Sequence, residues 1–179
     1  MKITVMSRNE AIAYSLREQI PTCVIISISC INDEYPSFIS SKYRSSKIKD
    51  VFPMRFNDLE KDYGIAKDRF RAPVQKDLNG LKDFIDKYKD RVEEIIVHCA
   101  AVISRSSAVA AAIALYLGEN EKAIIWDNYK YRPNRLVYKL ARNEFGIATT
   151  EEEYNDIFYH NYKVQTSEEL PEELFDDWL

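Results

Sequence analysis

The sequence predicts an α/β domain built on a largely parallel sheet. Short runs rich in Val and Ile alternate along the chain with segments whose apolar residues recur at helical spacing. The runs at residues 22–29 and 93–98 have the composition of strands that are buried on both faces. Helical segments separate the strands, and a strand reached by a helical crossover lies parallel to the one before it.

Length and composition limit the class of protein. The chain has 179 residues, of which 46% are apolar and 30% charged, so we expect an ordered domain with a substantial core. No apolar run approaches the roughly 18 residues of a membrane span, and Met1–Met6 is too short for a secretory signal. Cys23, Cys30 and Cys99 lie too far apart for a disulfide framework or a zinc site. We therefore expect a cytoplasmic protein with no metal and no membrane partner.

The charge divides the chain into two parts. Residues 149–179 carry ten acidic residues and one lysine, a net charge of −9, whereas residues 1–148 carry 24 basic and 19 acidic residues, a net charge of +5. We expect a domain over 1–148 and an acidic extension over 149–179, which is partly helical and packs on the domain through its aromatic residues. The basic body suits an anionic ligand other than nucleic acid, although a solvated surface with an acidic end explains the same pattern.

The first two strands flank a short helix. Lys2–Met6 alternates as a strand, and Ser7 with Glu10 three residues later is a capping box that begins a helix. That helix should reach about Gln19, because a proline follows soon after. Thr22–Ser29 is then a buried strand.

The middle of the chain is less regular. Residues 30–48 are polar and predict a long loop, and Asp50–Phe56 predicts a short strand that Pro53 assigns to an edge of the sheet. Residues 57–72 are charged without clear periodicity and predict a loop. Pro73 fits the first residue of a helix that reaches about Asp90.

The last elements are clearer. Glu93–His98 predicts a buried strand, and Ser106–Leu117 predicts an Ala-rich helix that can pack closely against the sheet. Pro133–Phe145 predicts an amphipathic helix that Gly146 ends.

The segment between the last buried strand and the Ala-rich helix carries the chemistry. It reads His98, Cys99, five residues, Arg105 and Ser106. A short loop from a strand to a helix start turns several backbone N–H groups toward one point, which binds an anion and stabilises a thiolate nucleophile. The guanidinium of Arg105 can grip two phosphate oxygens, and Ser106 can donate to the thiolate as it leaves. The pattern predicts phosphoryl transfer onto sulfur, followed by hydrolysis.

This segment resembles the protein tyrosine phosphatase superfamily, and within it the compact dual-specificity-like phosphatases. Their signature, which is His-Cys, five residues, Arg, then Ser or Thr at a strand-to-helix turn, matches here position by position, and the resemblance covers about residues 22–145. It implies a mixed or parallel central sheet with helices on both faces, and no metal or organic cofactor. Substrates would be a phosphorylated protein or a small phosphate ester. The implied phosphate-binding loop comprises Ala100, Ala101, Val102, Ile103, Ser104 and Arg105.

One position departs from that family. The third residue after the cysteine is usually Gly, and here it is Val102, in a loop that has no glycine. Glycine serves where the backbone takes a positive φ or approaches a ligand closely, and a β-branched residue resists a positive φ. We expect Val102 either to give the loop a different path or to impair the site.

The family also uses an upstream aspartate as the general acid that protonates the leaving oxygen. Asp58, Asp62 and Asp68 are the candidates. Asp58 directly follows the predicted third strand, which is where the family places its acid, whereas Asp68 lies at the family's usual separation from Cys99. We rank Asp58 first, because its place after a strand survives insertions in the loop. All three also fit ordinary solvated loop residues.

The remaining candidates are weaker. We expect His98 to support the loop by hydrogen bonding, and Cys23 to be a small core residue. Cys30 lies at the end of the predicted strand over residues 22–29 and could form a disulfide with Cys99, although nothing in the sequence supports the geometry. Asn128–Arg135 fits a basic phosphate-binding rim or an ordinary helix start, and His160 has no visible partner.

Three functions remain open at this point. The first is a phosphotyrosine or dual-specificity phosphatase that uses Cys99, Arg105, Asp58 and Ser106. The second is a catalytically impaired phosphate-binding module of the same fold, which Val102 favours. The third is a rhodanese-like sulfurtransferase, which the histidine and Arg-Ser context disfavours. We expect a monomer by default.

Overall fold

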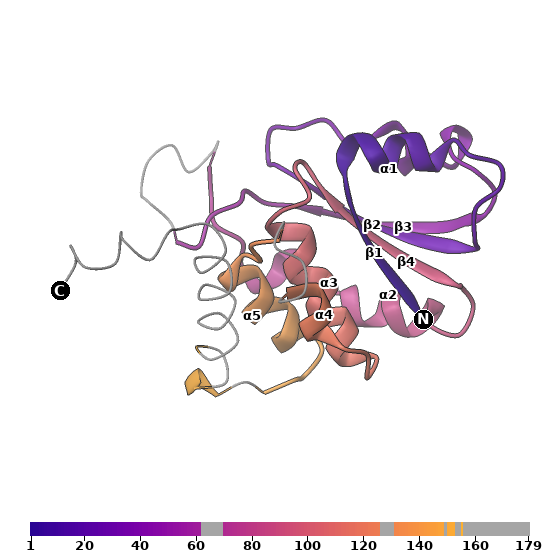
Figure 1. The fold of residues 1–179 in the computed structure, drawn as a ribbon. Coiled ribbons are helices and arrows are strands. Elements are labelled where there is room, and N and C mark those ends of the chain that lie inside the picture. The colour runs from indigo at the N-terminus through magenta and orange to yellow at the C-terminus, as the bar shows by residue number, and fades with distance from the viewer. Residues whose placement is uncertain (62–69, 126–130, 149, 153–154, 156–179) are drawn as a thin grey trace, which may run out of the picture.

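Four parallel strands form one sheet in the order β1-β4-β2-β3. They are β1 (Lys2–Ser7), β2 (Cys23–Ser29), β3 (Ile48–Arg55) and β4 (Glu94–Cys99). The computed structural model describes residues 1–61, 70–125, 131–148, 150–152 and 155 (Figure 1). Because β1 and β3 are the edges, β2 and β4 lie inside the sheet, and all residues of both are buried.

Helices cover both faces of the sheet, so the predicted α/β class is confirmed. Figure 1 shows α1 on one face and α2, α3, α4 and α5 gathered on the other. The helices are α1 (Arg8–Ser15), α2 (Leu81–Tyr88), α3 (Arg105–Tyr116), α4 (Glu121–Ile125) and α5 (Arg135–Glu144), with short 3-10 helices η1 (Ser37–Ile39), η2 (Ser41–Tyr43) and η3 (Gln75–Asp77). The strands are parallel at every pairing of the described residues, so the sheet is parallel rather than mixed.

Two hydrophobic clusters fill the space on the two faces. Val24, Ile26 and Ile28 of β2 belong to the larger cluster, which includes α2, α3 and α5, whereas Cys23 and Ile25 belong to the smaller one near α1. Successive side chains of a strand point to opposite faces, so a strand covered on both sides must be apolar at nearly every position. This explains the continuous apolar run of β2, and it confirms Cys23 as a core residue.

The capping box at the start of α1 is confirmed. The Ser7 hydroxyl accepts a hydrogen bond from the Glu10 N–H (3.3 Å), and the Glu10 carboxylate accepts one from the Ser7 N–H (2.7 Å). The helix ends at Ser15, one turn before the predicted Gln19. The Leu16 N–H bonds the Tyr14 carbonyl instead of continuing the helical pattern.

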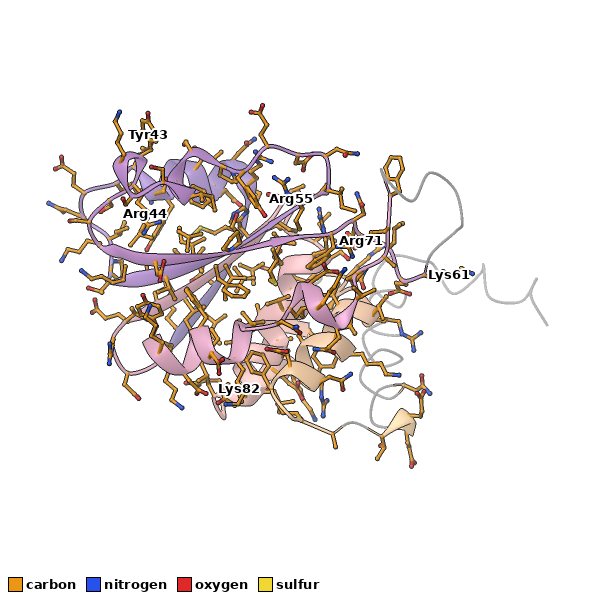
Figure 2. The ribbon with its side chains drawn as sticks, turned by 180° about the vertical axis from the view of Figure 1, so that it is seen from behind. Tyr43, Arg44, Arg55, Lys61, Arg71 and Lys82 are labelled. Carbon is orange, nitrogen blue, oxygen red and sulfur yellow. The ribbon has the colours of Figure 1, made fainter. Side chains whose placement is uncertain are left out.

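The predicted helix from Pro73 to Asp90 is wrong at its start. Residues after Pro73 form the 3-10 helix η3, and α2 begins only at Leu81. Asp77 closes the turn, because its carboxylate accepts from the Val74 N–H (2.8 Å) and from both terminal nitrogens of Arg71 (2.6 Å each). Figure 2 labels Arg71. Gly80 then takes a left-handed φ of 85°, which a continuous helix does not allow.

The remaining elements follow the prediction closely. β3 lies at an edge of the sheet, as Pro53 indicated, and α3 and α5 lie within two residues of their predicted ranges. The loop predicted over 30–48 contains the two short 3-10 helices η1 and η2. Among the described helices, none is both long enough and apolar enough for a membrane span. Of the predicted acidic extension, only residues 150–152 and 155 are described.

Candidate active site

The predicted chemical segment lies at the carboxyl edge of the sheet. Cys99 ends β4, Arg105 begins α3, and residues 100–104 connect them. The neighbouring strand β1 ends beside this loop, where Ser7 is in register with Cys99 and the Arg8 N–H bonds the Ala100 carbonyl (3.5 Å). In open parallel sheets, ligands bind beyond the carboxyl ends of the strands.

The loop offers unpaired backbone donors. None of the N–H groups of residues 100–105 donates a hydrogen bond to another residue in the described part of the chain. Ala100, Ala101 and Ile103 are exposed, so these groups are close to solvent. A strand-to-helix loop with free N–H groups at a helix N-terminus has the character of an anion site.

Cys99 is buried, and its sulfur contacts the side chain of Ser106. The Sγ–Oγ distance is 3.1 Å, and the Ser106 hydroxyl is also 3.1 Å from the Val102 carbonyl oxygen. The hydroxyl has one proton, so it cannot donate to both atoms at once. With a neutral thiol, the sulfur donates to Ser106, which donates to the carbonyl; with a thiolate, the hydroxyl proton turns to the sulfur.

Within the described part of the chain, Arg105 is held deep in the site by its Nη1 group alone. Its side chain is 3% exposed, and Nη1 donates to the Phe56 carbonyl (2.8 Å) and to the Cys30 sulfur (3.3 Å). The buried Nε has no hydrogen-bond partner among the described residues. Leaving a buried donor of a charged group unpaired costs on the order of 1–3 kcal/mol or more, so this N–H is suited to an anionic ligand.

Val102 has a left-handed backbone, with φ of 72°. Among the described residues it is the only non-glycine with a positive φ. Val102 therefore takes a left-handed turn, for which glycine is the usual residue. For a β-branched side chain this conformation costs of order 1–3 kcal/mol.

His98 lies beneath the loop, inside the sheet. Its Nε2 is 2.8 Å from the Ser27 hydroxyl of β2, and Phe38 packs edge-on against the ring with the centroids 5.4 Å apart. Burial, together with the nearby positive charges of Arg8 and Arg105, lowers the pKa of His98 to about 4, so the ring is neutral at pH 7. The structure thus connects His98 to the neighbouring strand β2.

Asp58 reaches the loop from the segment after β3. One carboxylate oxygen, Oδ1, accepts a hydrogen bond from the Ser104 hydroxyl (2.8 Å) and another from the Asn134 amide (2.8 Å). The structure therefore brings Asp58 together with the Cys99 loop. The other two candidate acids, Asp62 and Asp68, lie outside the described residues.

Sequence reasoning missed three contacts of this site. They are those of Asn134 with Asp58, of the Phe56 carbonyl with Arg105, and of Cys30 with Arg105. Of the predicted rim over 128–135, only 131–135 is described, and there Asn134 caps α5. An Asn before a helix is a recognisable cap signal, but no local pattern reveals its contact with Asp58. Cys30 and Cys99 are both free thiols here.

Comparisons with known proteins give only distant likenesses. No family model matches the chain, and no curated protein matches it either. Three solved structures are similar, namely human DUSP28 (10% identity, TM-score 0.43, 92% of this chain and 94% of that chain), PTPMT1 (16%, 0.48, 90% and 95%) and Tk-PTP in the active form (14%, 0.38, 90% and 90%). All three are proteins of the tyrosine or dual-specificity phosphatase fold. Their TM-scores lie below 0.5, so these likenesses carry no argument about function, which has to be inferred from the residues of this chain.

Proposed function

We propose that this chain is a cysteine-dependent phosphatase of the tyrosine or dual-specificity type, which hydrolyses phosphate monoesters through a phosphocysteine at Cys99. The observation that carries the proposal is the buried, unpartnered Nε of Arg105. It lies in the residue that follows a loop of unpaired N–H groups, and that loop begins at a buried thiol. An anion bound in the loop would complete the hydrogen bonding of all these donors.

Binding would be set by Arg105 and the loop. The carbonyl of Phe56 fixes one end of the guanidinium through Nη1, so the fork is oriented before a ligand arrives. Its remaining N–H groups and those of residues 100–105 would hold the three equatorial oxygens of a phosphoryl group. Such a preorganised set stabilises the charge that spreads over these oxygens during transfer.

The first chemical step would be attack by Cys99. The thiolate forms an S–P bond as the P–O bond to the leaving group breaks, and Asp58 donates its proton to the leaving oxygen. Asp58 is suited to this role because it is exposed and its side chain bonds Ser104 of the loop (2.8 Å).

The second step would regenerate the enzyme. A water molecule attacks the phosphorus, its proton passes to the Asp58 carboxylate, and the S–P bond breaks to release inorganic phosphate. The electron pair returns to the Cys99 sulfur, and the Ser106 hydroxyl at 3.1 Å donates to the thiolate as it leaves.

A second candidate is a binding module that holds phosphate but turns over poorly. The left-handed Val102 favours it, because strain within the loop can disturb the convergence of the donors. The two functions share the loop, Arg105 and the ligand. They differ only in turnover.

Activity and binding measured side by side separate the candidates. We expect the purified protein to hydrolyse p-nitrophenyl phosphate and to bind inorganic phosphate or vanadate by calorimetry. Binding without hydrolysis identifies the impaired module, and the absence of both overturns the anion site. Phosphotyrosine, phosphoserine and phosphoinositide substrates then define the substrate class.

The Cys99→Ser variant tests the covalent step. We expect turnover to be abolished and vanadate binding to persist, because the donors are mostly backbone groups. Cys23→Ala is the matched control, since Cys23 is also a buried thiol but lies at the amino end of β2. Hydrolysis by Cys99→Ser at the parent rate would contradict the phosphocysteine mechanism.

A further inference from the structure

We propose that Asn134 is the positioning residue for the general acid, holding Asp58 against the Cys99 loop. The inference rests on the proposed function, because it assigns a role to Asn134 only if Asp58 donates a proton there. Asn134 lies 76 positions from Asp58 in the chain, and its Nδ2 donates to Asp58 Oδ1 at 2.8 Å.

Asn134 is itself fixed by three further hydrogen bonds. Its Oδ1 accepts from the Val137 N–H (2.9 Å), which caps α5, and its carbonyl accepts from the Tyr138 N–H (3.0 Å). Its own N–H donates to the Ser104 carbonyl (3.2 Å). The side chain is 4% exposed. The amide that contacts Asp58 is therefore immobilised at the start of a packed helix.

The contacts close a triangle. Ser104 donates its hydroxyl to Asp58 Oδ1 (2.8 Å), Asn134 donates its amide to the same oxygen, and Asn134 bonds Ser104 directly. Two neighbouring hydrogen bonds also join the segment at the start of α5 to the other two segments. The Arg132 N–H donates to the Ile103 carbonyl in the loop after β4 (2.9 Å), and the Arg135 N–H donates to the Glu60 carboxylate in the segment after β3 (2.9 Å). Asp58 is thus tied both to the loop and to α5.

This arrangement selects which oxygen of Asp58 acts. Both bonds reach Oδ1, and no described residue bonds Oδ2. Oδ2 is therefore the oxygen that can carry the proton toward a leaving group. A proton donor must lie within hydrogen-bond reach of the atom that it protonates, and an exposed aspartate without these bonds would sample several rotamers. Asn134 supplies a fixed donor that does not titrate.

Two substitutions remove the amide donor and keep a helix cap. Asn134→Ser retains a good cap residue with too short a side chain to reach Asp58, and Asn134→Asp retains the cap and the shape but faces Asp58 with a second acceptor. Melting temperature and vanadate binding report whether the fold and loop are intact. Either variant can serve if the other fails to fold.

We expect Asn134→Ser to lower kcat/KM for phenyl phosphate, which has a poor leaving group, by about tenfold, because kcat/KM reports the first step, in which Asp58 protonates the leaving oxygen. The loss on p-nitrophenyl phosphate should stay below about threefold, because a good leaving group needs little protonation, and KM should change by less than about twofold. In an Asp58→Asn background the same substitution should cause no further loss, since the two residues act as one unit.

The outcomes separate the two proposals. A parent protein without phosphatase activity overturns the proposed function and this inference together. An active parent overturns only the inference if Asn134→Ser leaves kcat/KM unchanged, if it lowers kcat/KM for both substrates equally, or if its loss adds to that of Asp58→Asn. Each of those results would assign Asn134 a structural role alone.

Discussion

A buried charged residue lies at or near each end of β4, and the two differ in whether their hydrogen-bonding groups are paired. Glu94 begins the strand and is 1% exposed, and Cys99 ends it and is 2% exposed. Both oxygens of the Glu94 carboxylate are paired. Oε1 forms an ion pair with Lys2 (2.8 Å) and accepts a hydrogen bond from the Thr4 hydroxyl, and Oε2 accepts one from the Tyr14 hydroxyl (2.6 Å). At the other end, the Nε of Arg105 has no partner among the described residues.

The difference separates a buried charge that the fold pairs fully from one that it leaves partly unpaired. Burial alone would raise the pKa of Glu94, but the bonds from Lys2, Thr4 and Tyr14 outweigh it and hold the pKa below its ordinary value. Burial and the same carboxylate raise the pKa of Cys23 to about 12, so that thiol stays neutral. The charge at the amino end is paired within the fold, whereas the Nε of Arg105 at the carboxyl end has no partner among the described residues.

Arg105→Lys breaks the carboxyl end most severely. A lysine keeps the charge but cannot bond Phe56 and a phosphate through one planar fork, so we expect kcat/KM for p-nitrophenyl phosphate to fall by about a hundredfold or more. Arg142→Lys is the matched control, because Arg142 is also buried and its Nε also has no partner among the described residues, but it lies in α5 and bonds Tyr138 and Ala148. A loss below about tenfold for Arg105→Lys would show that the guanidinium does not contact the phosphoryl group.

Asp58→Asn tests the acid at the same end. We expect kcat/KM for phenyl phosphate to fall by about a hundredfold and that for p-nitrophenyl phosphate by only a few fold, because kcat/KM reports the first step, in which only the poor leaving group depends on protonation. The control is Asp68→Asn, in the same assay. If Asp68→Asn shows this selectivity and Asp58→Asn does not, the acid is Asp68.

Local patterns predicted most of the fold. β2 and α3 were predictable because burial on both faces and Ala-rich helical packing are visible within a dozen residues of sequence. The start of α2 was not, because it depends on a contact between Arg71 and Asp77 and on the left-handed Gly80. Proline at a helix start is a weaker signal than a turn closed by a buried carboxylate.

The candidate site also has one part that a local sequence pattern predicts and another that depends on contacts between distant residues. Cys99, Arg105 and Ser106 lie within eight positions, so one motif predicts that they come together, while their catalytic roles stay predictions. The positive φ of Val102 was not predictable from its residue type, because valine resists that conformation, and only the resemblance, in which this position is usually Gly, drew attention to it. The contacts of Arg105 with Phe56 and of Asp58 with Asn134 span 49 and 76 positions, and only the folded chain brings those groups together.

Glu94→Gln breaks the amino end and should leave the site intact. We expect the free energy of unfolding at pH 7 to fall by about 1–3 kcal/mol, with turnover of p-nitrophenyl phosphate unchanged within about twofold. Urea unfolding at several pH values gives the measurement. The pKa of Glu94 is lower in the folded chain than its ordinary 4.5, so its contribution is complete above that pH and is lost as the pH falls through the folded value. The gap between parent and variant should therefore narrow in acid; a constant gap would mean that the carboxylate charge is not what stabilises this end.

Val102→Gly should have the smallest effect. It tests whether the positive φ in the loop at the carboxyl end of β4 lowers the free energy of unfolding. The positive φ of 72° costs valine of order 1–3 kcal/mol and costs glycine almost nothing. Glycine also makes the unfolded chain more flexible, which offsets up to about 1 kcal/mol of the stability gained by relieving this strain. The change in unfolding free energy should therefore be small.

Turnover is the more telling measurement for that variant. If strain keeps the donors of the loop partly disordered, releasing about 1.4 kcal/mol raises turnover by at most about tenfold, and we expect a rise of several fold on p-nitrophenyl phosphate. Val102→Ala is the control, because alanine removes the β-branch but keeps the Cβ that disfavours a positive φ. It should give a smaller rise than glycine. Equal or lower turnover in Val102→Gly would mean that the loop accepts valine without loss of function, and the proposal of an impaired binding module would then lose the one feature of this chain that favours it.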